Sequence, residues 1–302
     1  MRPEFKVSQT ALSDTISVSC NICGSVKSHI RSTVDRYGLP VNSVICKECG
    51  LIYLNPMMTQ NAYWRFYASG EYRKLLNAFK KPVTPDESYS QSVDFGIRIA
   101  KVIGPFLHDG LTVEVGSSRG GILHGLKKAK DTIIPLGVEP SIEEAEYAIA
   151  KGIPTQKTII EELSDSVNDV KNILSVRSLN HMVDPTRFLD YTKKHLSDDG
   201  RLFIIVLDFM KFCLRNKAFI SQIDHPYMFF PDTLRQLVEK CGFKINLCEV
   251  RGAYIYLYAQ RACESKIRVR KKTRSYALTR IFLSELALRP EFDTHRHFLG
   301  PQ

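Results

Sequence analysis

The chain has 302 residues, of which 44% are hydrophobic and 25% charged, and its formal net charge is +10. This length accommodates one large domain and a small accessory module, and the composition is that of a soluble globular protein. The apolar runs are far shorter than the roughly 20 residues that cross a bilayer, and the first 15 residues lack the apolar core of a secretion signal. We therefore expect a cytoplasmic protein with reduced thiols and no transmembrane segment.

The positive charge is concentrated near the C-terminus. Residues 261–302 contain ten Lys or Arg and four Asp or Glu, so this segment contributes +6 and the rest of the chain +4. Clustered cations attract polyanions such as RNA or anionic lipid. No aromatic residues alternate with these charges, as a base-stacking platform would require. We therefore interpret residues 263–302 as a solvated basic tail, with nucleic-acid binding as the alternative.

Two Cys-x-x-Cys pairs, each followed by glycine, lie in the first 50 residues. Two intervening residues let both sulfurs of a pair face one tetrahedral ion, and two such pairs complete a four-thiolate shell. A full shell leaves no open position for a reactant, so we predict a structural zinc site in a module of residues 1–58. An iron site and a redox pair are the alternatives. The predicted ligands are Cys20, Cys23, Cys46 and Cys49.

Residues 59–94 are predicted to form a helical connector. Aromatic residues recur at near-helical spacing between Gln60 and Phe79, which favours a packing stripe. The alternative is a lid, with Tyr67 or Tyr72 closing over a ligand. Prolines at positions 82 and 85 flank a polar run that we interpret as a hinge before the large domain.

The large domain, residues 95–262, opens with an apolar strand over 111–115, a glycine-rich turn over 114–121 and a helix. This order begins a doubly wound sheet that binds a nucleotide. A second strand ends at Glu139, 25 positions after Glu114. A carboxylate at that strand tip accepts the hydroxyls of a ribose, so we expect an adenosine-containing ligand.

Further strands are predicted over 172–176, 201–207, 244–250 and 254–259, and helices over 142–151, 185–195 and 232–241. Asp232 is the expected N-cap of the last helix. The short connection between the last two strands requires an antiparallel hairpin. The predicted fold is α/β: a Rossmann-like doubly wound sheet with a terminal antiparallel hairpin, plus an N-terminal zinc-ribbon module.

These motifs together resemble class I S-adenosylmethionine-dependent methyltransferases. The segments CxxCG, CxxCGLIYLNP, FYASGEYRK, GVEPS and SLNHMVDP further resemble bacterial methyltransferases with an N-terminal zinc module, including deoxysugar C-methyltransferases. Those enzymes carry a long C-terminal domain, whereas about 40 residues follow the last predicted strand here, so we favour another methyl acceptor, such as a hydroxyl. The resemblance implies a cofactor site formed by Glu114, Gly116, Ser118 and Gly120 at the methionine part, Glu139 at the ribose, Ile160 and Glu161 at the adenine and Ser178 beside the sulfonium.

Two positions depart from the family pattern. Ser118 replaces the usual middle glycine, which permits binding provided that its φ is negative. Asn180 stands before His181 where relatives commonly have glutamate. If the acceptor is a hydroxyl, His181 is our first candidate for the base, with His225 and Tyr227 as further candidates.

We thus expect a methyltransferase that acts on a small molecule or glycan, such as a sugar, nucleotide sugar or polysaccharide. An RNA methyltransferase and a non-catalytic binding protein on the same scaffold are the alternatives. The sequence does not specify the acceptor or the oligomeric state.

Overall fold

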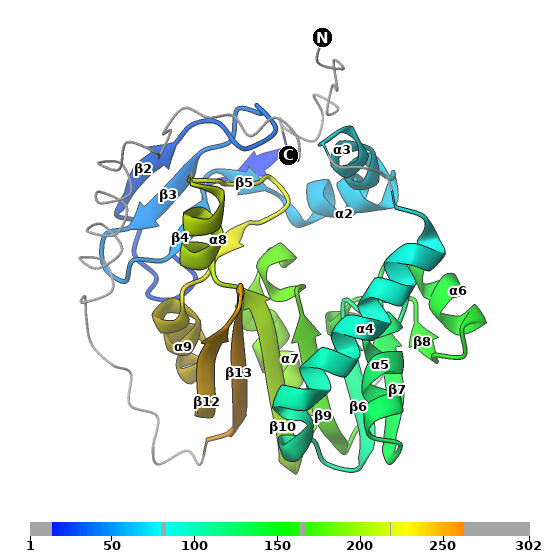
Figure 1. The fold of residues 1–302 in the computed structure, drawn as a ribbon. Helices are drawn as coiled ribbons and strands as arrows, with labels where there is room; N and C mark the ends of the chain where they lie inside the picture. The colour runs from blue at the N-terminus through cyan, green and yellow to red at the C-terminus, as the bar shows by residue number, and fades with distance from the viewer. Residues whose placement is uncertain (1–13, 80–82, 164–166, 218, 263–302) are drawn as a thin grey trace.

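The structure is a computed structural model that describes residues 14–79, 83–163, 167–217 and 219–262. Its larger part is a seven-stranded sheet in the order β12-β13-β10-β9-β6-β7-β8 (Figure 1). The five strands from β10 to β8 are parallel, and β13 runs antiparallel to both of its neighbours, β10 and β12. The predicted α/β class and terminal hairpin are therefore confirmed. The strands are β6 (Gly110–Val115), β7 (Ile133–Val138), β8 (Thr155–Gln156), β9 (Val170–Val176), β10 (Leu196–Leu207), β12 (Phe243–Arg251) and β13 (Tyr254–Arg261).

The central strands are apolar because helices cover both faces of the sheet. Along β10, Leu202, Ile204 and Val206 pack on one face, and Phe203 and Ile205 pack on the other. The first face meets α7 (Pro185–His195) and α9 (Pro231–Lys240), and the second meets α4 (Pro85–Ile103) and α5 (Gly121–Ala129). Successive side chains of a strand point to opposite faces of the sheet, so alternate residues of β10 belong to two separate apolar layers.

Helix α4 crosses the front of the sheet beside α5 (Figure 1). It begins with a capping box formed by Thr84 and Glu87, and Pro85 occupies its first turn. The predicted boundary between residues 94 and 95 therefore falls inside one continuous helix, whose first residue is Pro85; Pro82 of the predicted hinge lies outside the described residues. Gly96 and Gly125 let the backbones of the two helices touch, since a Cβ on Gly125 would lie 2.2 Å from the carbonyl oxygen of Val93.

The N-terminal part contains a second sheet, in the order β11-β4-β3-β2. Its outer strand β11 (Tyr227–Met228) comes from the segment between β10 and α9, and it pairs with β4 (Ile52–Leu54). No sequence signal predicted this pairing. The remaining strands there are β2 (Ser28–Ser32) and β3 (Ser43–Cys46), with β1 (Thr15–Ile16) and β5 (Met57–Met58) as a separate pair.

Other helices differ from the prediction in detail. The aromatic segment forms two helices, α2 (Gln60–Ala68) and α3 (Glu71–Phe79), separated at Gly70, which has a φ of +73°. The expected N-cap Asp232 is wrong: Pro231 starts α9, so the cap position falls on Phe230 and Asp232 lies in the first turn. The remaining elements are α6 (Ile142–Ala150), α8 (Phe209–Asn216) and the short 3-10 turns η1 (Gly104–Phe106), η2 (Ile160–Glu162) and η3 (Leu179–His181).

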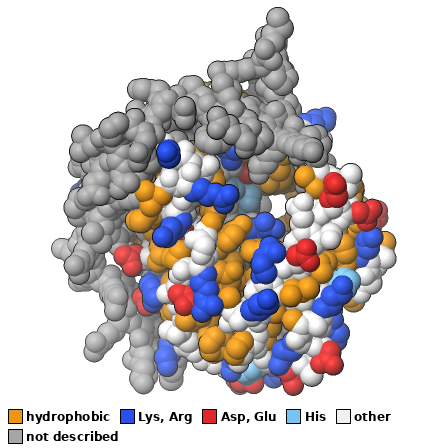
Figure 2. All heavy atoms as spheres, in the orientation of Figure 1, with side chains coloured by type: hydrophobic (Ala, Val, Ile, Leu, Met, Phe, Trp, Pro, Cys, Tyr) orange, Lys and Arg blue, Asp and Glu red, His pale blue; other side chains and the backbone are white. Residues whose placement is uncertain are grey.

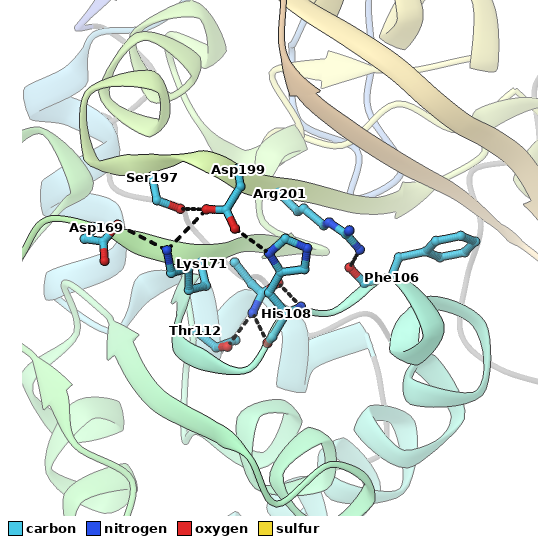
Figure 3. Close-up of polar contacts among 9 residues, drawn as sticks. Phe106, His108, Thr112, Asp169, Lys171, Ser197, Asp199 and Arg201 are labelled. Atoms are coloured by element: carbon cyan, nitrogen blue, oxygen red, sulfur yellow. Dashed lines mark hydrogen bonds and ion pairs between the residues drawn. The ribbon is translucent and has the colours of Figure 1, made fainter.

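The amino ends of the parallel strands are held together by polar contacts (Figure 3). The buried amide of Asn172 on β9 donates to the His108 carbonyl at 2.8 Å and to the Thr112 hydroxyl at 2.9 Å. Lys171 pairs with Asp199 at 3.2 Å, and Asp199 also approaches His108 at 3.3 Å. This edge is fastened internally, so the ligand crevice expected of such a sheet lies at the opposite, carboxyl edge.

Candidate functional site

The glycine-rich turn lies where β6 ends and α5 begins. Gly116 and Gly120 have φ values of +74° and +73°, which glycine adopts without steric cost. A Cβ on Gly116 would lie 2.6 Å from the Cβ of Ser178, the residue that precedes η3 after β9. The Ser178 hydroxyl donates to the Val115 carbonyl at 2.7 Å. The turn after β6 and the turn after β9 are therefore in direct contact at the carboxyl edge of the sheet.

Ser118 differs from the expectation, because its φ is +47° rather than negative. This left-handed conformation costs a residue other than glycine about 1–2 kcal/mol. Two hydrogen bonds hold it: the Ser118 amide donates to Glu139 Oε2 at 2.8 Å, and its hydroxyl donates to Glu144 Oε2 at 2.7 Å. Glu144 in turn pairs with Arg119 at 2.9 Å. Hydrogen bonds to Glu139 and Glu144 thus stabilise a backbone conformation that glycine would adopt without cost.

Glu139 lies at the end of β7, where the sequence placed it. Its carboxylate accepts from the amides of Ser118 at 2.8 Å and Ser141 at 2.9 Å. Carboxylate oxygens accept hydrogen bonds, which is the chemistry that a ribose hydroxyl requires. Glu139 is also what shapes the turn, a role that the sequence did not reveal.

Glu114 is fully buried in β6, and among the described residues neither of its carboxylate oxygens has a hydrogen-bond partner. Burial raises the pKa of Glu114 well above its usual value, opposed by the positive charge of Arg177. A buried polar group without a partner is costly. A ligand that brings a cation or a hydrogen-bond donor to this carboxylate would remove that cost.

The expected adenine-binding segment is the turn η2. Ile160 is buried, which suits an apolar wall of a base-binding cleft. The side chain of Glu161 lies outside the described residues, so its predicted role stays a prediction.

A cluster of imidazole, phenol and carboxyl groups lies one turn beyond Ser178. His181 closes η3, and its Nδ1 lies 3.1 Å from the hydroxyl of Tyr67. The ring of His225 meets the His181 ring edge-on, with 4.6 Å between centroids. His225 Nε2 lies 3.5 Å from Asp224 Oδ2. We call His181, His225, Asp224 and Tyr67 the histidine cluster.

Tyr67 and Tyr72 extend the wall of this cluster. Their rings lie 4.8 Å apart between centroids, and Tyr72 meets the His181 ring edge-on at 6.3 Å. Burial raises the pKa of Tyr67 well above its usual value, so its hydroxyl keeps its proton beside His181 Nδ1. The two tyrosines, for which a lid was the alternative to a packing stripe, therefore contact the base candidate.

Burial also lowers the pKa of His181 below its usual value, opposed by the charge of Asp224 and a hydrogen bond with the Asp224 backbone. The imidazole is consequently neutral at pH 7 and retains a lone pair, as a proton acceptor requires.

The structure adds Asp224 to the candidate catalytic residues and places Tyr227 in packing contacts. Asp224 is 1% exposed, and its Oδ1 has no hydrogen-bond partner within the described ranges. Asp224 is not among the residues predicted from the sequence, although it directly precedes His225. Tyr227 is buried in β11, where its hydroxyl donates to the Val183 carbonyl at 3.0 Å and its ring stacks on Phe229. These contacts suit a packing residue.

The four N-terminal cysteines converge. Their sulfur atoms all lie within 4.8 Å of one another, with 3.4 Å between Cys20 and Cys49 and between Cys23 and Cys46. Zinc–sulfur bonds of about 2.3 Å place the sulfurs of a tetrahedral site about 3.8 Å apart. The donor set and spacing therefore fit a zinc site with four cysteine ligands.

On the face in Figure 2, Lys and Arg side chains are interspersed with hydrophobic and acidic ones. The predicted basic tail, residues 263–302, lies outside the described residues. Among the helices that the structure describes, none is long and apolar enough to cross a bilayer.

No protein-family model and no curated protein sequence matches the chain. Among solved structures, the mitomycin 7-O-methyltransferase MmcR matches with a TM-score of 0.50 and 16% identity, over 66% of this chain and 60% of that protein. The chain has the methyltransferase fold. A methyltransferase of Thermotoga maritima, described as a possible histamine N-methyltransferase, matches at 0.46 and 21%, over 66% of this chain and 97% of its own. The plantazolicin methyltransferase BpumL, solved with S-adenosylhomocysteine, matches at 0.48 and 13%, over 67% and 94%.

Proposed function

We propose that the chain is an S-adenosylmethionine-dependent methyltransferase that methylates a hydroxyl of a small molecule or glycan. The observation that carries this proposal is the buried carboxylate of Glu114, without a hydrogen-bond partner among the described residues, at the end of the strand that leads into the glycine turn. The fold binds ligands at this edge, and the ammonium group of the cofactor's methionine part is a cation that would compensate that carboxylate.

The chain's own residues divide into those that hold the cofactor and those that act on the acceptor. Gly116 and Gly120 give the turn its positive φ values, Glu139 at the end of β7 supplies acceptor oxygens for a ribose, and Ile160 contributes an apolar wall. The cofactor supplies an activated methyl group when bound. The protein then has to align the acceptor and exclude water.

The histidine cluster suits the removal of the acceptor's proton. His181 lies three residues after Ser178, and its amide donates to the Ser178 carbonyl at 2.9 Å, so its position is tied to the turn that touches Gly116. We place the proton acceptor at His181, reached through the hydroxyl of Tyr67 that occupies its Nδ1. The neutral state of His181 supports this role.

The zinc ion has a structural role in this proposal. All four positions of the shell are sulfur, which leaves none for a substrate. Through the pairing of β4 with β11, the module that zinc holds is joined to the segment that carries Asp224 and His225.

Calorimetric titration with S-adenosylmethionine, S-adenosylhomocysteine and adenosine tests the cofactor assignment. Glu114→Gln should weaken binding of the first two, which carry the ammonium group, by about 10- to 100-fold, since hydrogen bonds to charged groups contribute about 1.5–3 kcal/mol. Adenosine binding should be unchanged. Glu146→Gln, an exposed carboxylate paired with Lys157, is the matched control. Absence of heat with both cofactor forms in the unmodified protein would overturn the proposal.

A further inference from the structure

The N-terminal module reaches the histidine cluster through a chain of hydrogen bonds. Asp35 and Arg36 of this module bind the segment before His225: the Asp35 carboxylate accepts from the Ile223 amide at 3.0 Å, and the Arg36 amide donates to the Ser221 carbonyl at 2.9 Å. Between these two anchored positions lies Gln222, whose side chain is 5% exposed. The module therefore fixes the backbone on both sides of Gln222.

The side chain of Gln222 has only one orientation that satisfies its neighbours. Its Oε1 lies 3.3 Å from Arg36 Nη1 and 3.4 Å from the Tyr37 hydroxyl. A guanidinium has no lone pair and can only donate, so the atom that faces it must be the amide oxygen. Burial raises the pKa of Tyr37, so its hydroxyl keeps a proton to donate to the same oxygen. The amide orientation, often ambiguous in proteins, is decided here by chemistry.

The opposite end of that amide faces His225. Gln222 Nε2 lies 3.2 Å from His225 Nδ1, and an amide nitrogen donates only. The Nδ1 atom must therefore be the unprotonated, accepting nitrogen of the neutral ring. Its proton is then on Nε2, which lies 3.5 Å from Asp224 Oδ2.

We infer that Arg36 and Tyr37, acting through Gln222, are positioning residues that hold His225 as the neutral imidazole with its proton on Nε2. His225 is then a hydrogen-bond donor within the cluster, because its lone pair is occupied by Gln222. The proton position follows from these contacts, whereas the assignment of the proton acceptor to His181 belongs to the proposed function.

This arrangement also opposes a metal ion at the cluster. His181, Asp224 and His225 bring one ligand atom each within 4.8 Å of one another, as a two-histidine, one-carboxylate site would. A histidine that binds a metal donates its other ring N–H to an acceptor. Gln222 presents a donor to that nitrogen instead, so binding through Nε2 would leave the ring with no proton on either nitrogen.

Nitrogen-15 NMR of protein labelled at the histidine rings tests the inference, with His225 assigned by the spectrum of His225→Gln. At a pH where the ring is neutral, the wild-type signals should show a proton on Nε2 and none on Nδ1. Gln222→Glu keeps the oxygen for Arg36 and Tyr37 but offers only acceptors, so the proton should appear on Nδ1. Asn246→Asp makes the same change at an exposed amide that bonds Gln260, and should leave His225 unchanged.

The double variant Arg36→Met with Tyr37→Phe provides a second test that adds no charge. Without its two donors the Gln222 amide is free to rotate, and His225 should show both tautomers. A wild-type proton on Nδ1, or unchanged His225 signals in both variants, would overturn the inference. Metal analysis of folded wild-type protein should find about one zinc per chain, and a second ion lost with His225→Gln would also contradict it. Calorimetry with S-adenosylmethionine on the same samples reports separately on the proposed function.

Discussion

Asp35 should make the stability of the protein fall as the pH rises. Its carboxyl is 2% exposed, and burial raises its pKa from 3.8 to about 7, only partly opposed by amide donors from Leu39, Ile223 and Tyr37. The folded protein therefore retains a proton that the unfolded chain releases above about pH 4. In this window stability decreases by up to about 1.36 kcal/mol per pH unit, because the folded state binds more protons.

The variant Asp35→Asn isolates this contribution, because its side chain does not titrate. The substitution also weakens the hydrogen bonds of this side chain, but that cost is the same at every pH. It therefore adds a constant to the difference between the wild-type and variant free energies of unfolding and does not affect how this difference changes with pH. From pH 5.5 to pH 7 wild type should lose about 1.6 kcal/mol relative to the variant, because the folded-state carboxyl is itself half titrated at pH 7. Urea denaturation at several pH values measures this. The control Asp94→Asn makes the same substitution on the exposed side of α4. A difference between wild type and Asp35→Asn that does not change with pH would refute the reasoning.

Three further predictions concern the helix crossing, the metal and the base. Gly125→Ala, whose Cβ would lie 2.2 Å from a backbone oxygen, should cost about 1–3 kcal/mol by denaturation, whereas Gly104→Ala, with nothing within 4 Å, should be close to neutral; equal effects would contradict the close helix contact. Cys20→Ser should release the zinc and unfold the N-terminal sheet, and Cys248→Ser should retain one zinc per chain by metal analysis. Because the pKa of His181 is lowered, methyl transfer should rise with pH along an acid limb below pH 6.5. His181→Asn should reduce kcat about 100-fold or more, and a profile unchanged in this variant would exclude His181 as the base.

The strands and helices of the large sheet were predictable because their signals are local. The apolar runs over 172–176 and 201–207 are buried on both faces, and helix 185–195 begins and ends as its Asp-Pro start and basic last turn indicate. The spacing of the four cysteines was similarly sufficient to predict that their sulfur atoms lie close together. In each of these cases the chemistry lies within a few consecutive residues.

The contacts that define the histidine cluster were not predictable in this way. The pairing of Tyr67 with His181 joins positions 114 residues apart, and that of Tyr37 with Gln222 joins positions 185 apart. The strand β11, which joins the segment after Gln222 to the N-terminal sheet, has only two residues and therefore no period to recognise. Asp224 was not predicted for a related reason. Adjacent aspartate and histidine residues are common on protein surfaces, and only the structure shows that Asp224 is buried.

The same two-residue strand affects how the protein is made. The N-terminal sheet has only three of its strands, β2 to β4, until residue 228 has been synthesised, more than 170 residues after β4. At a translation rate of about 5–20 residues per second, the open edge of β4 waits on the order of 10–30 s for its partner. Early zinc capture would hold the three strands in register during that interval, so metal supply should govern the yield of folded chains in the cell.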